Sequence, residues 1–147
     1  MREVSLERNT NETQIELTLN LDGAGRYQVD TGCGFLNHML ELFARHGRFD
    51  LVLTCHGDVE VDYHHTAEDI GIALGQAFAR ALGDMRGICR YGSFYLPATI
   101  HFVQFAGENT HHILEACFKG AGHALAAAVK IDAAHRDEIP STKGLLV

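Results

Sequence analysis

The motif His-His-x-x-Glu occurs twice in this chain, at residues 64–68 and again 47 residues further on, at residues 111–115. On an α-helix, residues four apart lie on one face, so the first His and the Glu of each copy can hold a metal ion together. Imidazole nitrogens and carboxylate oxygens suit Mn, Fe, Co, Ni or Zn ions. A single such His would favour a surface or capping role, whereas two copies at one spacing favour a metal centre. The residues concerned are His64, His65, Glu68, His111, His112 and Glu115.

The second His of each copy is rotated to the side of its own pair and cannot easily join it. A duplicated unit with a pseudo-twofold axis resolves this, because each helix then supplies its second His to the ion of the other helix. The shift of 47 residues also matches Gly75 with Gly122, as a duplication requires. The predicted sites are His64, Glu68 and His112 for one ion, and His111, Glu115 and His65 for the other.

Three predicted helices carry these side chains. Apolar spacing predicts helices over residues 35–46, 65–82 and 111–129, of which the first two are ended by a glycine. The first of them carries His38 among apolar residues. A polar group buried in such surroundings needs a partner, and a metal ion is one candidate.

Predicted strands precede the helices. Alternating polar and apolar residues predict strands over 13–21 and 26–30, joined as a hairpin by the turn between them. Residues 49–55 and 99–105 predict two further strands, each followed by a turn and a His-His helix. Residues 59–62 are expected to be short and extended.

The two copies of the repeat are unequal in length. The first copy has a hairpin and a helix before its strand and its His-His helix, and there is no room for a second hairpin and a second such helix between Pro97 and Ala98. We therefore expect one domain over residues 1–147. It consists of a first repeat half at 1–90 and an incomplete second half with a C-terminal tail at 91–147.

Composition excludes several classes of protein. The 147 residues are 46% hydrophobic and 21% charged, as in an ordinary globular domain. A formal net charge of −7 without a basic block disfavours binding to nucleic acid or to an anionic membrane. No apolar run is long enough for a transmembrane helix and the first residues lack a signal-peptide centre, so we expect a cytoplasmic protein with reduced, mostly buried cysteines. These are Cys33, Cys55, Cys89 and Cys117.

The other five of the ten histidines are expected to be ordinary. His46 precedes a helix-ending glycine, where a cation is favourable because the C-terminus of a helix is negative. The remaining four are predicted on the surface (His123 and His135), in a turn (His56) and in a strand (His101).

Motifs along nearly the whole chain resemble those of the imidazoleglycerol-phosphate dehydratase family of histidine biosynthesis. The family usually has Asp where this chain has Asn37. After Pro97, family members continue with a strand pair and a second copy of the first helix (residues 35–46 in this chain), and both are absent here. The matching stretches are residues 8–13, 31–40, 45–51, 62–71, 81–84, 107–119 and 139–144.

This resemblance implies an α+β fold of two similar half-domains, each a sheet backed by helices as in the second domain of ribosomal protein S5. It also implies a homo-oligomer, a 24-subunit assembly of trimers in this family, with active sites between subunits and two Mn²⁺ ions per site. Carried over residue by residue, one ion has the ligands His38, His65, His111 and Glu115. The other has His64, Glu68 and His112, and its fourth ligand would lie on the helix that is absent here.

The resemblance implies a reaction as well, the removal of water from D-erythro-imidazole-glycerol phosphate to give imidazole-acetol phosphate. The hydrogen to be lost is on an unactivated carbon, so a carboxylate must move protons while metal ions polarise the ring. Either Glu12 or Glu68 is expected to do this. Contacts to this small phosphorylated substrate carry over to Glu12, His38, Arg90, Ser141, Thr142 and Lys143, whereas a further phosphate-binding Arg lies in the absent segment.

The absent segment leaves alternatives open. Three accounts are open: the segment is unrecorded in this sequence, it is truly deleted, or pairing with another subunit replaces it. A chain that truly lacks it is expected to have strongly reduced dehydratase activity, or to be an inert metal-binding oligomer. A metal-dependent hydrolase is the other class, because His/Glu metal pairs also activate water, but the full set of family motifs argues against it.

Overall fold

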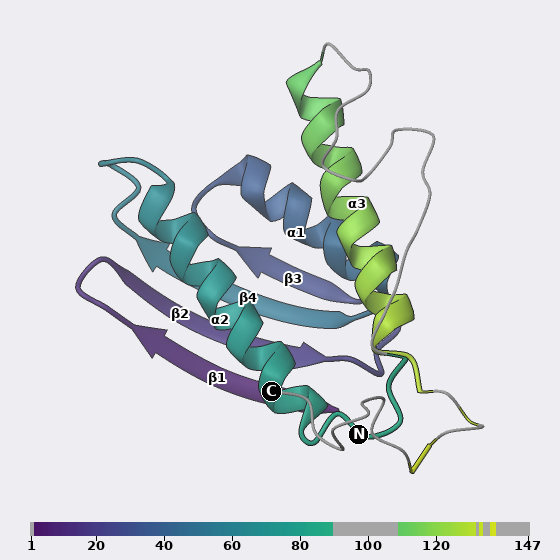
Figure 1. Ribbon diagram of the computed structural model, residues 1–147. Coiled ribbons are helices and arrows are strands. Elements are labelled where there is room, and N and C mark those ends of the chain that lie inside the picture. Colours follow the sequence, from purple (N-terminus) through teal and green to yellow (C-terminus); the bar gives the residue numbers. More distant parts are fainter. Residues whose placement is uncertain (1, 90–108, 132, 134–135, 138–147) are drawn as a thin grey trace.

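The computed structural model describes residues 2–89, 109–131, 133 and 136–137 (Figure 1). It has an α+β architecture in which helices cover one face of a mixed sheet (Figure 1). The strands are β1 (Glu3–Asn9), β2 (Thr13–Asn20), β3 (Tyr27–Asp30) and β4 (Asp50–Gly57). The helices are α1 (Gly34–Gly47), α2 (His64–Leu82) and α3 (Thr110–Ala128).

The sheet has the strand order β1-β2-β4-β3. The pairs β1–β2 and β2–β4 are antiparallel, whereas β3 and β4 are parallel. Parallel neighbours cannot be joined by a tight turn and need a crossover connection, which α1 provides between β3 and β4. The predicted hairpin of residues 13–21 with 26–30 is therefore wrong, because β4 lies between these two strands.

Asp50 explains why β3 lies beside β4. Its carboxylate accepts hydrogen bonds from the backbone nitrogens of Ala24 (2.8 Å) and Arg26 (2.9 Å) and from the Arg26 guanidinium (2.5 and 3.0 Å). The Leu51 nitrogen also donates to the Arg26 carbonyl at 2.9 Å. These hydrogen bonds hold the turn before β3 against the start of β4. They thereby set the parallel register of the two strands.

We expect Asp50→Asn to lower the free energy of unfolding at neutral pH. We also expect this free energy to depend less on pH in the acid range. The Arg26 hydrogen bond lowers the pKa of Asp50 from 3.8 to about 2. A lowered pKa in the folded state adds stability that is complete above about pH 4 and is lost as the pH falls towards about 2. Urea midpoints at neutral pH and across that window test this, with the exposed Asp30→Asn as control. Equal acid sensitivity in Asp50→Asn and the unsubstituted chain would contradict it.

The core lies between the sheet and its helices. The alternation predicted for the second strand is confirmed, since Ile15, Leu17 and Leu19 on β2 are buried. Helix α1 packs on β3 and β4, and α2 packs on β1, β2 and β4. Helix residues complete this core from the side opposite the sheet, among them Leu40 and Phe43 on α1 and Ile70, Ala73 and Ala77 on α2.

All three predicted helices are confirmed, each within a residue or two of its expected bounds. Gly83 follows α2 with a φ of 56° and ends it as expected. At the end of α1, the left-handed residue is Arg48, with a φ of 57°, and Gly47 is the last helical residue. Glycine is needed at position 47 for a different reason, because a Cβ atom there would lie 2.5 Å from the Phe49 ring.

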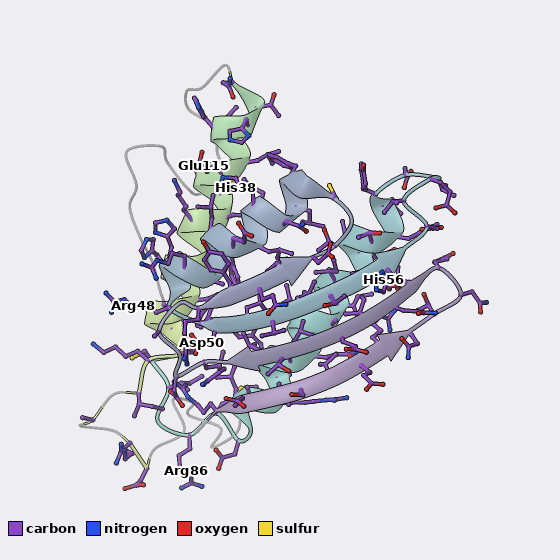
Figure 2. All side chains as sticks on the ribbon, turned by 180° about the vertical axis from the view of Figure 1, so that it is seen from behind. His38, Arg48, Asp50, His56, Arg86 and Glu115 are labelled. Carbon is purple, nitrogen blue, oxygen red and sulfur yellow. The ribbon has the colours of Figure 1, made fainter. Side chains whose placement is uncertain are left out.

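Several smaller expectations fail. Strand β1 is not predicted from the sequence, because Leu6 is its one fully buried residue and its pattern is mostly polar. Residues 59–62 form a turn instead of an extended segment. His56 lies on β4 instead of in a turn, exposed on the sheet face that the helices leave open (Figure 2).

The four cysteines are free, as expected, but Cys55 alone is fully buried and Cys89 is exposed. In the part of the chain that the structure describes, no helix combines the length and apolar character needed to cross a membrane. The expected strand at residues 99–105 lies outside the described residues.

Candidate metal centre

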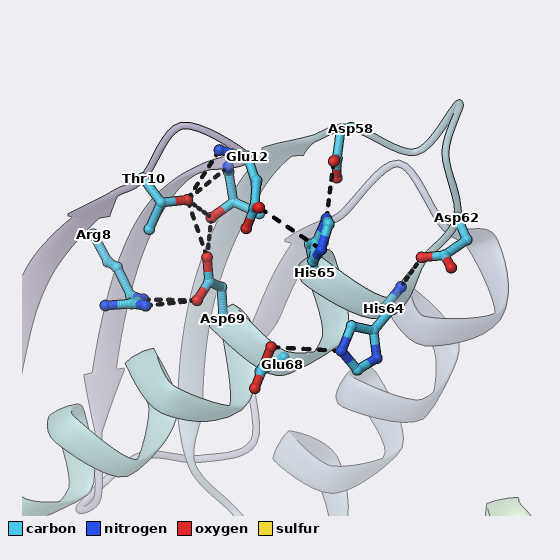
Figure 3. Close-up of polar contacts among 10 residues, drawn as sticks. Arg8, Thr10, Glu12, Asp58, Asp62, His64, His65, Glu68 and Asp69 are labelled. Carbon is cyan, nitrogen blue, oxygen red and sulfur yellow. Dashed lines mark hydrogen bonds and ion pairs between the residues drawn. The ribbon is translucent and has the colours of Figure 1, made fainter.

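The first His-His motif lies at the start of α2. The backbone nitrogen of His64 donates to Asp62 at 2.7 Å and so satisfies one of the free N–H groups of this helix end. One helical turn on, Glu68 places Oε2 3.6 Å from His64 Nε2 (Figure 3). Both side chains are well exposed to solvent. They lie on the same face of α2, as the spacing of four residues predicts.

His65 turns away from that pair, as predicted, and lies between two carboxylates. Its Nδ1 is 2.9 Å from Asp58 Oδ2, and its Nε2 is 3.8 Å from Glu12 Oε1 (Figure 3). The Asp58 hydrogen bond is the main reason why the pKa of His65 is raised above its ordinary value. Glu12, predicted from the resemblance, therefore lies at the same end of α2 as His65.

A buried carboxylate holds the Glu12 loop against α2. Asp69 accepts from Thr13 Oγ1 at 2.6 Å, from Arg8 at 2.6 and 3.1 Å and from Thr10 Oγ1 at 3.2 Å (Figure 3). Thr10 Oγ1 in turn accepts from the backbone nitrogens of Glu12 and Thr13. The Thr13 and Arg8 bonds keep the pKa of Asp69 below its ordinary value. Sequence reasoning missed Asp69, although it directly follows the first motif.

The second motif repeats the geometry of the first. Asn109 caps α3 by accepting from the His112 nitrogen at 3.1 Å. His111 Nε2 lies 3.7 Å from Glu115 Oε2, close to the distance in the first copy. Lys119, which the sequence analysis did not select, donates to Glu115 and is the main cause of the lowered pKa of that carboxyl.

His38 joins this second pair from α1. Its ring stacks on that of His111 with centroids 6.1 Å apart and an angle of 10° between the planes. Figure 2 shows His38 and Glu115 at the same end of the α1–α3 pair. His38 is exposed, which corrects the expectation of a buried polar group in need of a partner. The structure thus places His38 beside His111, which itself contacts Glu115, although the three side chains are not close enough to hold one ion together.

Close packing of α1 on α3 produces this meeting. Gly122 lies against α1 so tightly that a Cβ atom there would be 2.7 Å from the Phe43 carbonyl oxygen and 3.1 Å from the Gly47 nitrogen. A larger residue would push the helices apart and move His111 away from His38. The close approach therefore places His38 beside His111.

The repeat partner of Gly122 has no such neighbour. Among the described residues nothing lies within 4 Å of a Cβ atom built on Gly75 of α2. Beside it, an apolar groove of about 300 Å³ runs between the three helices. If the repeat is symmetric, as the sequence predicts, the helix expected after Pro97 would cover Gly75. The groove is lined by Leu40, Phe43, Leu74, Cys117, Phe118 and Ala121.

The two motifs do not meet within one chain. In residues 2–89 and 109–131, no three His, Cys, Asp or Glu side chains lie close enough to hold one metal ion. The pseudo-twofold combinations, His112 with the first pair and His65 with the second, are thus not formed here. The reason is the packing, since α3 lies on α1 while α2 lies on the sheet.

Other predicted residues contribute less. His46 contacts His123 with ring centroids 5.1 Å apart, and burial lowers the pKa of both, which disfavours the cation expected at that helix end. The remaining predicted residues lie outside the described part of the chain, namely Arg90, His101, His135, Ser141, Thr142 and Lys143.

Comparison with known proteins gives one consistent result. The family model for imidazoleglycerol-phosphate dehydratase matches residues 31–98. The imidazoleglycerol-phosphate dehydratase of Azorhizobium caulinodans is 43% identical over 195 positions, covering 99% of each chain. That of Xanthobacter autotrophicus is 42% identical over the same length and coverage.

Solved structures agree in fold. The enzyme of Pyrococcus furiosus, solved in complex with the compound (S)-C348, superimposes with a TM-score of 0.77 at 28% identity, covering 96% of this chain and all of that one. The Staphylococcus aureus enzyme gives 0.73 at 25% identity, covering 88% and 99%.

The alignments also bear on the absent segment. The Azorhizobium alignment spans 195 positions, at least 48 more than the 147 residues of this chain. The family-model match ends at residue 98, at the junction where the repeat is expected to be incomplete. The relatives therefore contain residues that have no counterpart here.

Proposed function

The chain belongs to the imidazoleglycerol-phosphate dehydratase family of hydro-lyases, and from this membership we propose that it dehydrates D-erythro-imidazole-glycerol phosphate to imidazole-acetol phosphate with Mn²⁺. The observation that carries the proposal is the matched pair of His–Glu contacts, 3.6 Å on α2 and 3.7 Å on α3. A duplicated contact of this kind on two exposed helix starts supplies nitrogen and oxygen donors in one repeated geometry. Such donors fit Mn²⁺ and related ions.

Each donor set in one chain is incomplete, so the proposal includes a second copy of the chain. The α1–α3 set has His38, His111 and Glu115, and the α2 set has His64 and Glu68, with His65 beside them. We infer that neighbouring subunits of a homo-oligomer bring the two sets together, with two ions per site. The exposure of His38, His64, Glu68 and His111 among the described residues supports this, whereas His65 and Glu115 are partly buried.

Bound metal ions would act as Lewis acids and as a template for the imidazole ring of the substrate. The chain's own carboxylates would move the proton. Glu12 and Glu68 are both about half exposed and lie at the same end of α2 (Figure 3), within reach of a bound molecule. The Asp69 network holds the loop that carries Glu12. For the phosphate we propose Arg90, Ser141, Thr142 and Lys143, since Arg and Lys offer charge and the hydroxyls offer donors.

The absent segment lowers the expected rate. One ion would lack its fourth ligand, and the open space at Gly75 among the described residues supports an incomplete helix layer. We therefore propose strongly reduced turnover in the 147-residue chain. An inert metal-binding oligomer is the second candidate, favoured by the same open surface.

The test combines metal content with turnover. We expect the purified chain, with an intact mass of 16.2 kDa, to retain Mn²⁺ and to dehydrate imidazole-glycerol phosphate far more slowly than the Azorhizobium relative. Glu68→Gln and Glu115→Gln should each lose metal, whereas His56→Gln, on the open sheet face, should not. Metal without turnover would identify the inert candidate. Absence of bound metal, or turnover close to that of the relative, would contradict the proposal.

A further inference from the structure

Asp58 makes one side-chain hydrogen bond among the described residues, and it makes it to a proposed metal ligand. Its Oδ2 is 2.9 Å from His65 Nδ1 (Figure 3). Its backbone is fixed on both sides, because its nitrogen donates to the Glu12 carbonyl at 3.1 Å and its carbonyl accepts from the Val61 nitrogen at 2.8 Å. The carboxylate is therefore held in place by the turn and does not simply follow the imidazole.

This contact determines which nitrogen of His65 carries the hydrogen. An ionised carboxylate can only accept, so Nδ1 must donate and, in the neutral ring, Nε2 keeps its lone pair. Nε2 points towards Glu12 Oε1 at 3.8 Å, which is too long for a hydrogen bond and leaves the lone pair uncommitted. The nitrogen that remains available thus faces the same side as the proposed catalytic carboxylate.

We propose that Asp58 is a positioning residue that holds His65 as its Nδ1–H tautomer, so that Nε2 is presented for a divalent metal ion. Carboxylates bonded to the far nitrogen of a metal-bound His fix its ring and raise its basicity. The proposal rests on the proposed function for the identity of the ion, but the orientation of the ring is a property of the metal-free protein.

Two features distinguish Asp58 from an ordinary surface acid. Its Oδ1 is buried and accepts no hydrogen bond among the described residues, an arrangement that costs stability. His64, the neighbour in the motif, differs in that its ring is 70% exposed and its Asp62 contact is made by the backbone nitrogen. Of the two histidines, His65 alone has a carboxylate on Nδ1 among the described residues.

The first test reads the tautomer without any metal. Long-range ¹H–¹⁵N spectra of the metal-free protein above about pH 8, where imidazole is mostly neutral, are expected to show His65 as Nδ1–H. His65→Gln assigns the signal. Asp58→Ala should shift the population towards Nε2–H, and Asp58→Asn, whose amide oxygen can still accept, should retain more Nδ1–H. An Nε2–H ring in the unsubstituted protein, or an unchanged tautomer in Asp58→Ala, overturns the proposal.

The second test measures Mn²⁺ affinity by titration followed by electron paramagnetic resonance. Asp58→Ala is expected to weaken binding roughly 10- to 100-fold and Asp58→Asn less. Glu60→Ala removes an exposed acid of the same turn and controls for the loss of charge; it should bind like the unsubstituted chain. Equal weakening in Glu60→Ala and Asp58→Ala would overturn the positioning role.

The two proposals fail in different ways. A chain that binds no Mn²⁺ contradicts the proposed function, while the tautomer spectra still decide the role of Asp58. A chain that binds Mn²⁺ but shows no tautomer change in Asp58→Ala contradicts the positioning role alone. If the alanine variant does not fold, Asp58→Asn can be measured in its place and still tests the positioning role.

Discussion

Replacement of Asp69 by alanine is expected to lower the free energy of unfolding by about 3 kcal/mol, because it breaks a largely buried ion pair and leaves other groups without partners. The Asp69 side chain is 9% exposed and that of Arg8 28% exposed. Without Asp69, the guanidinium loses its counter-charge, and the buried Thr13 hydroxyl loses the acceptor at 2.6 Å. Chemical denaturation at neutral pH measures the loss.

The same substitution should release the loop that carries Glu12. Thr10 links this loop to Asp69, so removal of the Asp69 carboxylate should weaken the approach of Glu12 to His65. Asp84→Ala provides the control, because Asp84 pairs with Arg86 in an exposed turn and the loss of this pair should change stability little. Similar losses in the two variants would contradict a structural role for Asp69.

Insertion of the relatives' additional segment between Pro97 and Ala98 is expected to raise turnover by on the order of 100-fold or more. The insertion would supply the missing ligand of one ion and a helix to cover Gly75, and small misplacements of catalytic groups already cost about that factor. The measurement is turnover of imidazole-glycerol phosphate at saturating Mn²⁺. A Gly/Ser segment of equal length is the control. An equal rise with that control, or no rise with the native segment, would contradict the prediction.

The helices were predictable because their signals are local. Apolar spacing lies within each of α1, α2 and α3, and a glycine marks the end of α1 and of α2, so their bounds follow from short stretches of sequence. The strand pairing was not predictable, because it depends on hydrogen bonds between Asp50 and a turn that is distant in the sequence. Strand β1 was missed since it is an edge strand with little buried surface.

The candidate site divides in the same way. The His64–Glu68 and His111–Glu115 contacts follow from helix geometry alone and are found as expected. The approach of His38 to His111 depends on the docking of two helices far apart in the chain, and the resemblance supplied it where spacing did not. Asp69 was missed because its partners lie 56 to 61 residues away, and no local pattern encodes them.

Among the helices and strands that the structure describes, α3 makes its main contacts with α1. The residues that follow α3 also contact Arg2, Ile88 and Cys89. A helix that packs mainly on one other helix can be exchanged between two copies of a chain with those contacts preserved, which is the basis of domain swapping. Gly122 of one copy would then lie against Gly47 of another, and His111 would stack on a His38 that belongs to a different molecule. Whether the His38 and His111 rings that meet belong to one polypeptide or to two would then depend on protein concentration.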